Sequence, residues 1–313
     1  MSGSRCEVRV VTYRRPVWLK RALLSLQAQT HPDWVALVFD DSPTREGALV
    51  VQELNDERVV YRSNAVNLGA AANLDRAFQT AALAGGDYAC VLEDDNWLLP
   101  DFLAANVRCL GQTGSSIMMR NQEIWTQVGE KFQPTGRTTR GDTFRDGPHS
   151  ALQLRAHLFF HEGVSNGGLF WSTTAAGSLQ VGAEVQITGV QEYCRTLAVR
   201  DPLWFDSTPL AVWSELQPSS VTRGAHSNRN FARAIQEIRI ALVRHYGCSI
   251  LDEARQMAER THATSTLTRS LADLTLAQRR RCHLPITANS LKSYLRSKLV
   301  AHSLRPFLAS VSL

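Results

Sequence analysis

Four short apolar runs alternate with helix-like segments over the first hundred residues of the chain. The segment after the first run begins with Pro16, and its apolar residues then recur three and four positions apart, as on one face of a helix. Strand–helix–strand spacing of this kind is typical of an open, mostly parallel sheet flanked by helices, so the sequence predicts an α/β fold. The predicted strands are Cys6–Thr12, Trp34–Phe39, Arg58–Tyr61 and Tyr88–Leu92, and the predicted helices begin at Pro16 and cover Glu46–Leu54 and Ala71–Leu83.

The pattern is less regular beyond Pro100. Residues 129–149 are rich in Gly, Thr, Arg and Pro and predict a long flexible loop. The other predicted elements are a helix over Phe102–Leu110, strands over Ile117–Val128 and Gly168–Thr174, a helix that begins at Glu192, and an amphipathic helix over Asn230–Tyr246. From there to Leu313 the pattern is helical and rich in arginine. We therefore expect one region over residues 1–225 and a helical C-terminal extension over residues 226–313.

The composition limits the possible classes of protein but does not indicate a particular function. The 313 residues are 44% hydrophobic and 20% charged, with a net charge of +5, so the chain can bury a sizeable core and its mild, dispersed charge does not indicate nucleic-acid binding. No apolar stretch approaches the roughly 18–20 residues of a membrane-spanning helix, and the N-terminus lacks the apolar segment of a signal peptide. These features predict a cytoplasmic protein.

The six cysteines are widely spaced and form no Cys-x-x-Cys motif. In a cytoplasmic chain of this size such cysteines are expected to be reduced thiols, several of them small core residues. A thiolate metal site is not expected.

Polar residues follow three of the four predicted strands. They are Thr12-Tyr13, Asp40-Asp41 and Glu93-Asp94-Asp95-Asn96. Ligands of open parallel sheets bind beyond the carboxyl ends of the strands, so these residues are expected to meet in one crevice. Three consecutive carboxylates suit Mg²⁺ or Mn²⁺ held together with substrate phosphates. The alternative interpretation is a solvated acidic turn. A metal–phosphate site is favoured over it because Asp40-Asp41 lies at the matching end of another strand.

The N-terminal half resembles the inverting family 2 glycosyltransferases with the GT-A fold, of the type that acts on spore-coat polysaccharide. The resemblance is specific over residues 6–110, fainter to about residue 225, and does not cover the C-terminal region. It is carried by VVTYRRPVWLKRALLSLQAQT (Val10–Thr30), VFDDSP (Val38–Pro43), NDERVVYRSN (Asn55–Asn64) and VLEDDNWLLPDFL (Val91–Leu103).

This resemblance implies a GT-A domain over residues 1–225, with a nucleotide-binding half (1–110) and an acceptor half (111–225). It implies transfer of a sugar from a UDP-, dTDP- or GDP-linked donor to the hydroxyl of a polysaccharide, glycolipid or natural-product acceptor, assisted by Mg²⁺ or Mn²⁺. The residues it assigns to the nucleotide are Val11, Thr12, Tyr13, Asp40, Asp41 and Asp94, and those it assigns to the metal are Asp95 and Glu93. Arg14 or Arg62 can assist at the diphosphate, although each is more often a surface charge.

An inverting transfer also needs a general base for the acceptor hydroxyl. In the family an Asp or Glu near a helix start, about a hundred residues beyond the metal motif, has this role. Glu192 lies 97 positions after Asp95 and is the expected base. An ordinary glutamate in the first turn of a helix is the alternative interpretation, and Glu184 and Glu162 are competitors for the role.

The acceptor is expected to contact residues between 130 and 175, with His161, Glu162 and Trp171 as candidate contacts. A loop that leads into a strand with a half-buried Trp explains the same residues equally well. The sequence also departs from the family pattern. Its metal motif begins with Glu93, the loop over residues 67–73 lacks the usual arginine, and Gln217 lies near the place where the family can have a histidine ligand.

Two other functions stay open. A sugar nucleotidyltransferase shares the α/β layout and the metal, but it normally has a glycine-rich loop after the first strand, and this chain has Thr12-Tyr13-Arg14-Arg15-Pro16 there. A non-catalytic nucleotide-binding protein on the same fold is the second. At the C-terminus, Leu291, Tyr294, Leu295 and Leu299 predict a basic amphipathic helix, for which packing on the protein itself, a homodimer contact and a peripheral membrane contact are all open.

Overall fold

The computed structural model describes residues 4–141, 143–215, 225–288, 290–292 and 304–311. The chain divides into two compact units. Unit 1 comprises residues 1–148, 165–180 and 201–222, and unit 2 comprises residues 149–164, 181–200 and 223–313. This division differs from the boundary expected at residue 225, because two segments of the expected catalytic region belong with the C-terminal helices.

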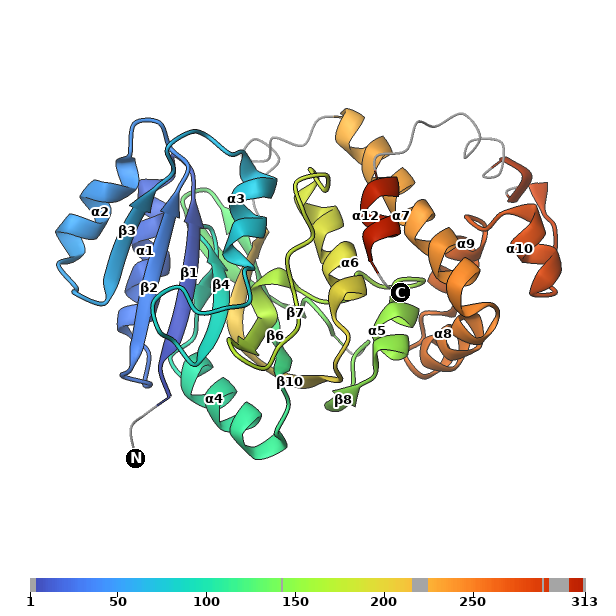
Figure 1. The fold of residues 1–313 in the computed structure, drawn as a ribbon, viewed down its shortest axis with the longest axis horizontal. Coiled ribbons are helices and arrows are strands. Elements are labelled where there is room, and N and C mark those ends of the chain that lie inside the picture. The colour runs from blue at the N-terminus through green and yellow to red at the C-terminus, as the bar shows by residue number, and fades with distance from the viewer. Residues whose placement is uncertain (1–3, 142, 216–224, 289, 293–303, 312–313) are drawn as a thin grey trace. The chain divides into compact units, whose positions relative to one another are not determined.

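Unit 1 is built on a mixed sheet (Figure 1). The strand order is β3-β2-β1-β4-β9-β6-β10-β5, with β7 paired to β6 and β8 paired to β10. Strands β3, β2, β1 and β4 are parallel, as the alternating pattern predicts, and β9 joins β4 in the antiparallel sense. The strands are β1 (Cys6–Thr12), β2 (Trp34–Asp40), β3 (Val59–Ser63), β4 (Tyr88–Glu93), β5 (Trp97–Leu98), β6 (Ile117–Val128), β7 (Lys131–Thr138), β8 (Gly147–His149), β9 (Leu169–Ser172) and β10 (Leu203–Glu215).

Among the described residues of unit 1, four α-helices follow strands, and apolar residues of three of them join one cluster with the sheet. They are α1 (Pro16–Gln27), α2 (Glu46–Leu54), α3 (Ala70–Ala77) and α4 (Phe102–Thr113). The buried leucines of α1 pack with Val8 and Val10 of β1 and with Phe102 of α4 in one apolar cluster. Full burial of each such side chain contributes about 1.5–3 kcal/mol, so this cluster fixes the frame that carries the strand ends.

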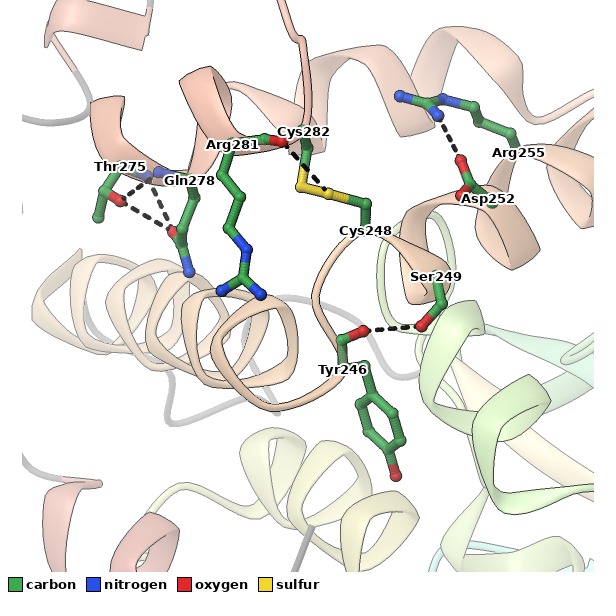
Figure 2. Close-up of a disulfide and its surroundings, with 9 residues drawn as sticks. All are labelled: Tyr246, Cys248, Ser249, Asp252, Arg255, Thr275, Gln278, Arg281 and Cys282. Carbon is green, nitrogen blue, oxygen red and sulfur yellow. Dashed lines mark hydrogen bonds and ion pairs between the residues drawn. A yellow bond between two sulfur atoms is a disulfide. The ribbon is translucent and has the colours of Figure 1, made fainter.

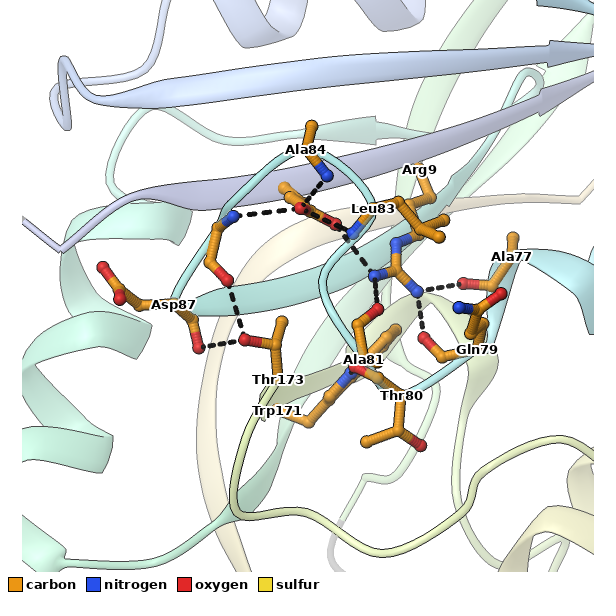
Figure 3. Close-up of polar contacts among 12 residues, drawn as sticks. Arg9, Ala77, Gln79, Thr80, Ala81, Leu83, Ala84, Asp87, Trp171 and Thr173 are labelled. Carbon is orange, nitrogen blue, oxygen red and sulfur yellow. Dashed lines mark hydrogen bonds and ion pairs between the residues drawn. The ribbon is translucent and has the colours of Figure 1, made fainter.

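The other face of β1 carries charge. Glu7 and Arg9 point to the same side of the strand, and both side chains are 0% exposed. Their carboxylate and guanidinium lie 2.8 Å apart. Figure 3 shows how the guanidinium of Arg9 donates to the carbonyl oxygens of Ala77, Gln79 and Ala81. Glu7 in turn accepts the backbone N–H groups of Leu83, Ala84 and Gly86.

The sequence pattern predicted a helix that continues to Leu83, but α3 ends at Ala77. The hydrogen bonds of Arg9 and Glu7 explain this earlier end. The carbonyls and N–H groups that would have continued the helix are bonded to Arg9 and Glu7 instead. The indole Nε1 of Trp171 on β9 adds a bond to the Thr80 carbonyl at 3.1 Å (Figure 3). Residues 78–86 are thereby held as an ordered connection into β4.

The expectation of a flexible loop over residues 129–149 is wrong for residues 131–138 and 147–149, which form β7 and β8. β7 pairs with β6 as a hairpin in which Val128 faces Lys131, and Gly129 adopts the positive φ of 62° that the tight connection requires. An exposed hairpin needs few apolar side chains, which is why a hydrophobicity pattern does not reveal it.

Unit 2 is helical in its described residues apart from its loops and the end of β8. Its helices are α5 (Ala151–His157), α6 (Thr188–Ala198), α7 (Ala225–Tyr246), α8 (Ser249–Arg260), α9 (Thr264–Leu271), α10 (Leu276–Arg281) and α12 (Arg305–Ser310). Its core gathers apolar side chains from α5, α6, α7 and α8, among them Leu197, Ile238 and Leu251. The predicted amphipathic helix over Asn230–Tyr246 lies within α7.

Unit 2 contains a disulfide between Cys248 and Cys282, so the expectation that all six cysteines are reduced is wrong (Figure 2). Cys248 lies in the turn before α8 and Cys282 directly follows α10, and their Cα atoms are 5.4 Å apart. Helix packing makes this pairing across 34 residues, and sequence spacing alone does not reveal it. The free cysteines of the structure are Cys6, Cys90, Cys109 and Cys194.

Among the described residues, the longest helices are too short or too polar to pass through a bilayer. Residues 294–299 of the expected basic amphipathic helix lie outside the described residues, as does Gln217.

Candidate active site

The ends of β1, β2 and β4 meet at one edge of the sheet in unit 1. The backbone N–H of Asp94, just beyond β4, donates to the Val11 carbonyl at 3.1 Å. On the other side of β1, the N–H of Asp41, just beyond β2, donates to the Thr12 carbonyl at 3.0 Å. The expectation that the Asp40-Asp41 pair and the 93–95 triplet gather at the same strand ends is therefore confirmed.

Asp94 is the buried member of the acidic segment. Its side chain is 5% exposed, and its Oδ2 accepts the Thr12 hydroxyl at 2.8 Å and the Tyr13 N–H at 3.4 Å. Burial, followed by the neighbouring charge of Asp95, raises the pKa of Asp94 to about 6, while Arg15 and the hydrogen bonds act in the opposite direction. Asp94 thus ties the loop after β1 to the loop after β4.

Arg15 supplies the counter-charge of this pair, and the sequence reasoning missed it. One guanidinium nitrogen, Nη1, lies 3.2 Å from Asp94 Oδ1 and 3.1 Å from Asp95 Oδ2. Arg15 is the residue directly before Pro16 and α1, and its Cζ lies 4.8 Å from the centre of the Trp18 ring. The sequence does place Arg15 in an Arg-Arg-Pro turn at a strand end, which could have indicated a role in the site. Only its neighbour Arg14 was considered for such a role.

Arg21 fixes the backbone of the acidic segment and was also missed. Its guanidinium donates to the Asp95 carbonyl and lies 4.2 Å from the ring centres of both Trp97 and Phe132. The two aromatic rings themselves meet edge to face. A cation held between two rings in this way keeps the turn after β4 in place.

Asp40 has different surroundings from those expected of a nucleotide contact. Asp40 is buried, and its carboxylate accepts the N–H groups of Ser42 and Gly47 and the Tyr61 hydroxyl, at 2.8, 3.0 and 2.9 Å. It anchors the start of α2, so the structure contradicts a nucleotide contact for Asp40.

Asp41 organises the loop that precedes α3. Its carboxylate accepts the side-chain amide of Asn64 and the N–H groups of Leu68 and Gly69, each at 2.8 Å. These bonds fix the loop at the edge of the site, and a contact from Asp41 to a nucleotide stays a prediction.

The residues after β1 are suited to a planar ligand. Tyr13 is 42% exposed, whereas the hydroxyl of Thr12 is used by Asp94. Val11 is half-buried at the end of the strand. Tyr13 can therefore present its ring to a base, and Thr12 acts through its bond to Asp94.

Whether a divalent cation fits the acidic segment Glu93–Asp95 depends on the oxygen ligands that the segment offers. Within the described residues, no three His, Cys, Asp or Glu side chains are grouped closely enough to hold a metal ion by themselves. Asp95 is 20% exposed and can offer one carboxylate, while Glu93 ends β4 and accepts the Asn96 side-chain amide at 3.3 Å. Mg²⁺ commonly uses one or two carboxylates together with substrate phosphates and water. The residues fit a cation that binds with a phosphate-bearing ligand.

Trp171 does not line a surface. It is 0% exposed, stacks on Phe78 and bonds to the Thr80 carbonyl, so the structure contradicts its expected contact with an acceptor. This favours the alternative of a loop that leads into a strand, although the Trp is fully buried and not half-buried as that alternative expected.

The other expected catalytic and acceptor residues belong to unit 2. Glu192 is half-buried in the second turn of α6, because that helix begins four residues earlier, at Thr188. The expectation that Glu192 lies in the first turn is therefore wrong, and its role as the base stays a prediction. Glu162 and Glu184 are exposed and His161 is half-buried, and their roles likewise stay predictions.

The strand ends, the acidic pair and the arginines lie at the carboxyl ends of the parallel strands of an α/β domain, which is where ligands of such sheets usually bind. Residues 7–157 match the glycosyl transferase family 2 profile, and this stretch of the chain is a glycosyl transferase family 2 domain. The GT-A fold expected from the sequence resemblance is confirmed by this match and by the solved structures described next.

Two curated proteins resemble parts of the chain. Protein CgeD of Bacillus subtilis is 28% identical over 111 residues, which are 34% of this chain and 26% of that protein. A putative colanic acid biosynthesis glycosyl transferase of Escherichia coli, WcaA, is 33% identical over 95 residues, which are 30% of this chain and 33% of that protein. The matched segments thus span about a quarter to a third of these relatives.

Among solved structures, TarS of Staphylococcus aureus has the same fold over nearly the whole chain. Its residues 1–349 in complex with UDP-GlcNAc superpose with a TM-score of 0.55 and 15% identity, over 98% of this chain and 87% of that one. The complex with UDP gives a TM-score of 0.54 and 14% identity, over 96% of this chain and 91% of that one.

Proposed function

We propose that this protein is an inverting glycosyltransferase that moves a sugar from a nucleotide-sugar donor to an acceptor hydroxyl with the help of Mg²⁺ or Mn²⁺. The observation that carries the proposal is the Asp94–Asp95 pair held by Arg15 at the joined ends of β1 and β4. The family 2 domain supports the reaction class, and the UDP-GlcNAc bound to TarS makes that compound the first donor to test.

In this proposal the residues of unit 1 bind and orient the donor. Tyr13 presents its exposed ring to the base, and Asp94 holds the loop of Tyr13 in place through the Thr12 hydroxyl. Asp95 would hold the cation together with the donor diphosphate. A cation bound there supplies neutralisation of the negative charge that develops on the leaving diphosphate.

The acceptor hydroxyl must lose a proton as its oxygen bonds to the anomeric carbon and the bond from that carbon to the diphosphate breaks. We assign the proton to Glu192, with Glu184 and Glu162 as the alternative carboxylates. Attack from the side opposite the diphosphate inverts the anomeric configuration. The acceptor is a hydroxyl of a polysaccharide, glycolipid or natural product.

The test uses the purified full chain with UDP-GlcNAc, and with other UDP-, dTDP- and GDP-linked sugars, in Mn²⁺, in Mg²⁺ and in EDTA. ³¹P NMR follows the phosphorus products. We expect metal-dependent release of nucleoside diphosphate, and an acceptor product with inverted anomeric configuration by ¹H NMR. A second incubation supplies a sugar phosphate and a nucleoside triphosphate in place of the nucleotide sugar. Formation of a nucleotide sugar with release of pyrophosphate there would instead show a nucleotidyltransferase. Tight binding without any turnover, with a full acceptor panel present, would contradict the enzymatic proposal.

A further inference from the structure

One guanidinium nitrogen is shared between the two carboxylates of the acidic pair. Nη1 of Arg15 lies within 3.2 Å of Asp94 and within 3.1 Å of Asp95. Two ionised carboxylates with one guanidinium leave one negative charge. The nearby guanidinium of Arg21 donates to the backbone carbonyl of Asp95, and the local field of Arg21 favours the charged form of both carboxylates.

The two carboxylates depend on Arg15 to different degrees. Asp94 also accepts the Thr12 hydroxyl and the Tyr13 N–H, and it is almost fully buried. Asp95 is more exposed, and its Oδ2 is the atom that Arg15 contacts. If Arg15 moves, Asp94 keeps hydrogen-bond donors while Asp95 gains an open carboxylate oxygen.

Arg15 is placed so that it can move. Its side chain is 37% exposed, and it extends from the residue directly before α1. A guanidinium binds phosphate oxygens in the same forked geometry with which it binds carboxylates. A divalent cation at Asp95 repels a guanidinium at the same oxygen, since like charges at that distance destabilise each other.

We propose that Arg15 is a positioning residue that competes with the divalent cation for the Asp95 carboxylate and leaves it for the diphosphate when a nucleotide binds. This inference rests on the proposed function, because it takes a nucleoside diphosphate as the ligand. Without nucleotide, Arg15 offsets one of the two negative charges of the acidic pair and keeps cation affinity low. With nucleotide, the diphosphate takes the guanidinium and the Asp95 carboxylate becomes open to the cation.

The first readout is Mn²⁺ binding without nucleotide, measured by EPR of free Mn²⁺. Loss of a partly exposed ion pair is worth about 0.2–1 kcal/mol, so we expect Arg15→Met to lower the Kd for Mn²⁺ by up to about fivefold. Lys20→Met is the control. It removes one formal charge from α1, where Lys20 pairs with Glu53 at 3.0 Å, and should change the Kd less than half as much. Arg15→Lys keeps a positive charge at the site and should stay near the wild-type Kd.

The second readout is UDP binding in EDTA by isothermal titration calorimetry. Arg15→Met should bind UDP more weakly than wild type, because the guanidinium for the diphosphate is lost, and Lys20→Met should not. The inference is overturned if wild type binds UDP and Mn²⁺ but Arg15→Met binds Mn²⁺ no more tightly, or if Lys20→Met shifts the Kd equally. Failure of wild type to bind UDP, dTDP, GDP or Mn²⁺ at all would overturn the proposed function as well, so the two failures are distinguishable. Far-UV circular dichroism of each variant separates misfolding from these effects.

Discussion

The Glu7–Arg9 pair offers the sharpest test of how unit 1 is held together. Arg9→Met removes a guanidinium that is 0% exposed and donates to three carbonyls between Ala77 and Ala81. It also leaves the buried Glu7 carboxylate without its counter-charge. Removing one partner of a buried pair typically costs about 3–5 kcal/mol. That is a large share of the roughly 5–15 kcal/mol by which most domains are stable, so we expect a loss of this size in the free energy of unfolding.

Urea unfolding followed by tryptophan fluorescence measures this loss in unit 1. All seven tryptophans of the chain belong to unit 1, so their emission reports on that unit. Lys20→Met is the control, because the Lys20–Glu53 pair is 49% and 63% exposed and should contribute less than about 1 kcal/mol. In the double variant Glu7→Gln, Arg9→Met the loss should be smaller than the sum of the single losses by about 1 kcal/mol or more. A loss of under 1 kcal/mol for Arg9→Met, with an unchanged urea dependence, would refute the reasoning.

Three further outcomes are expected. The backbone N–H bonds and Arg9 outweigh the opposing effect of burial and lower the pKa of Glu7 from its usual 4.5, so its contribution to stability is present above pH 4.5 and is lost as the pH falls through the lowered value. Glu7→Gln should therefore flatten the acid limb of a stability–pH profile, and an unchanged limb would contradict this. Replacing Cys248 and Cys282 by serine opens a loop of 34 residues and should cost about 4 kcal/mol by the chain-entropy relation, measured by far-UV circular dichroism in urea. An equal free energy of unfolding of the parent chain with and without reductant would contradict a formed disulfide. Glu192→Gln should leave donor binding intact and slow transfer by about 10²–10⁴, whereas Glu259→Gln, an exposed carboxylate of α8 and the control, should not. Unchanged transfer by Glu192→Gln would assign the base elsewhere.

The parallel half of the sheet was predictable because its strands are nearly continuous apolar runs. Parallel order then places every strand end at one edge, so the positions of Asp41 and Asp94 beside β1 followed from topology alone. What the sequence could not show is where each carboxylate points. Asp40 is used at the start of α2, which depends on the placement of Gly47 and Tyr61.

Arg15 and the disulfide escaped prediction for a related reason. Arg15 meets Asp95 across 80 residues, and Cys248 meets Cys282 across 34, so each pairing exists only after the helices and strands have packed. Glu7 and Arg9 did carry a local signal. Two charged residues two positions apart within the apolar run Cys6–Thr12 share one side of a strand, and burial of that side requires that they pair.

The measurement that tests the central claim most directly is the affinity of UDP for wild type and Asp95→Asn, by calorimetry in Mn²⁺ and in EDTA. In the proposed function, Asp95 would hold the cation together with the diphosphate. Mn²⁺ should therefore tighten UDP binding to wild type and have little effect on Asp95→Asn. Equal tightening of both proteins by Mn²⁺ would contradict the account, because the cation would then bind without Asp95.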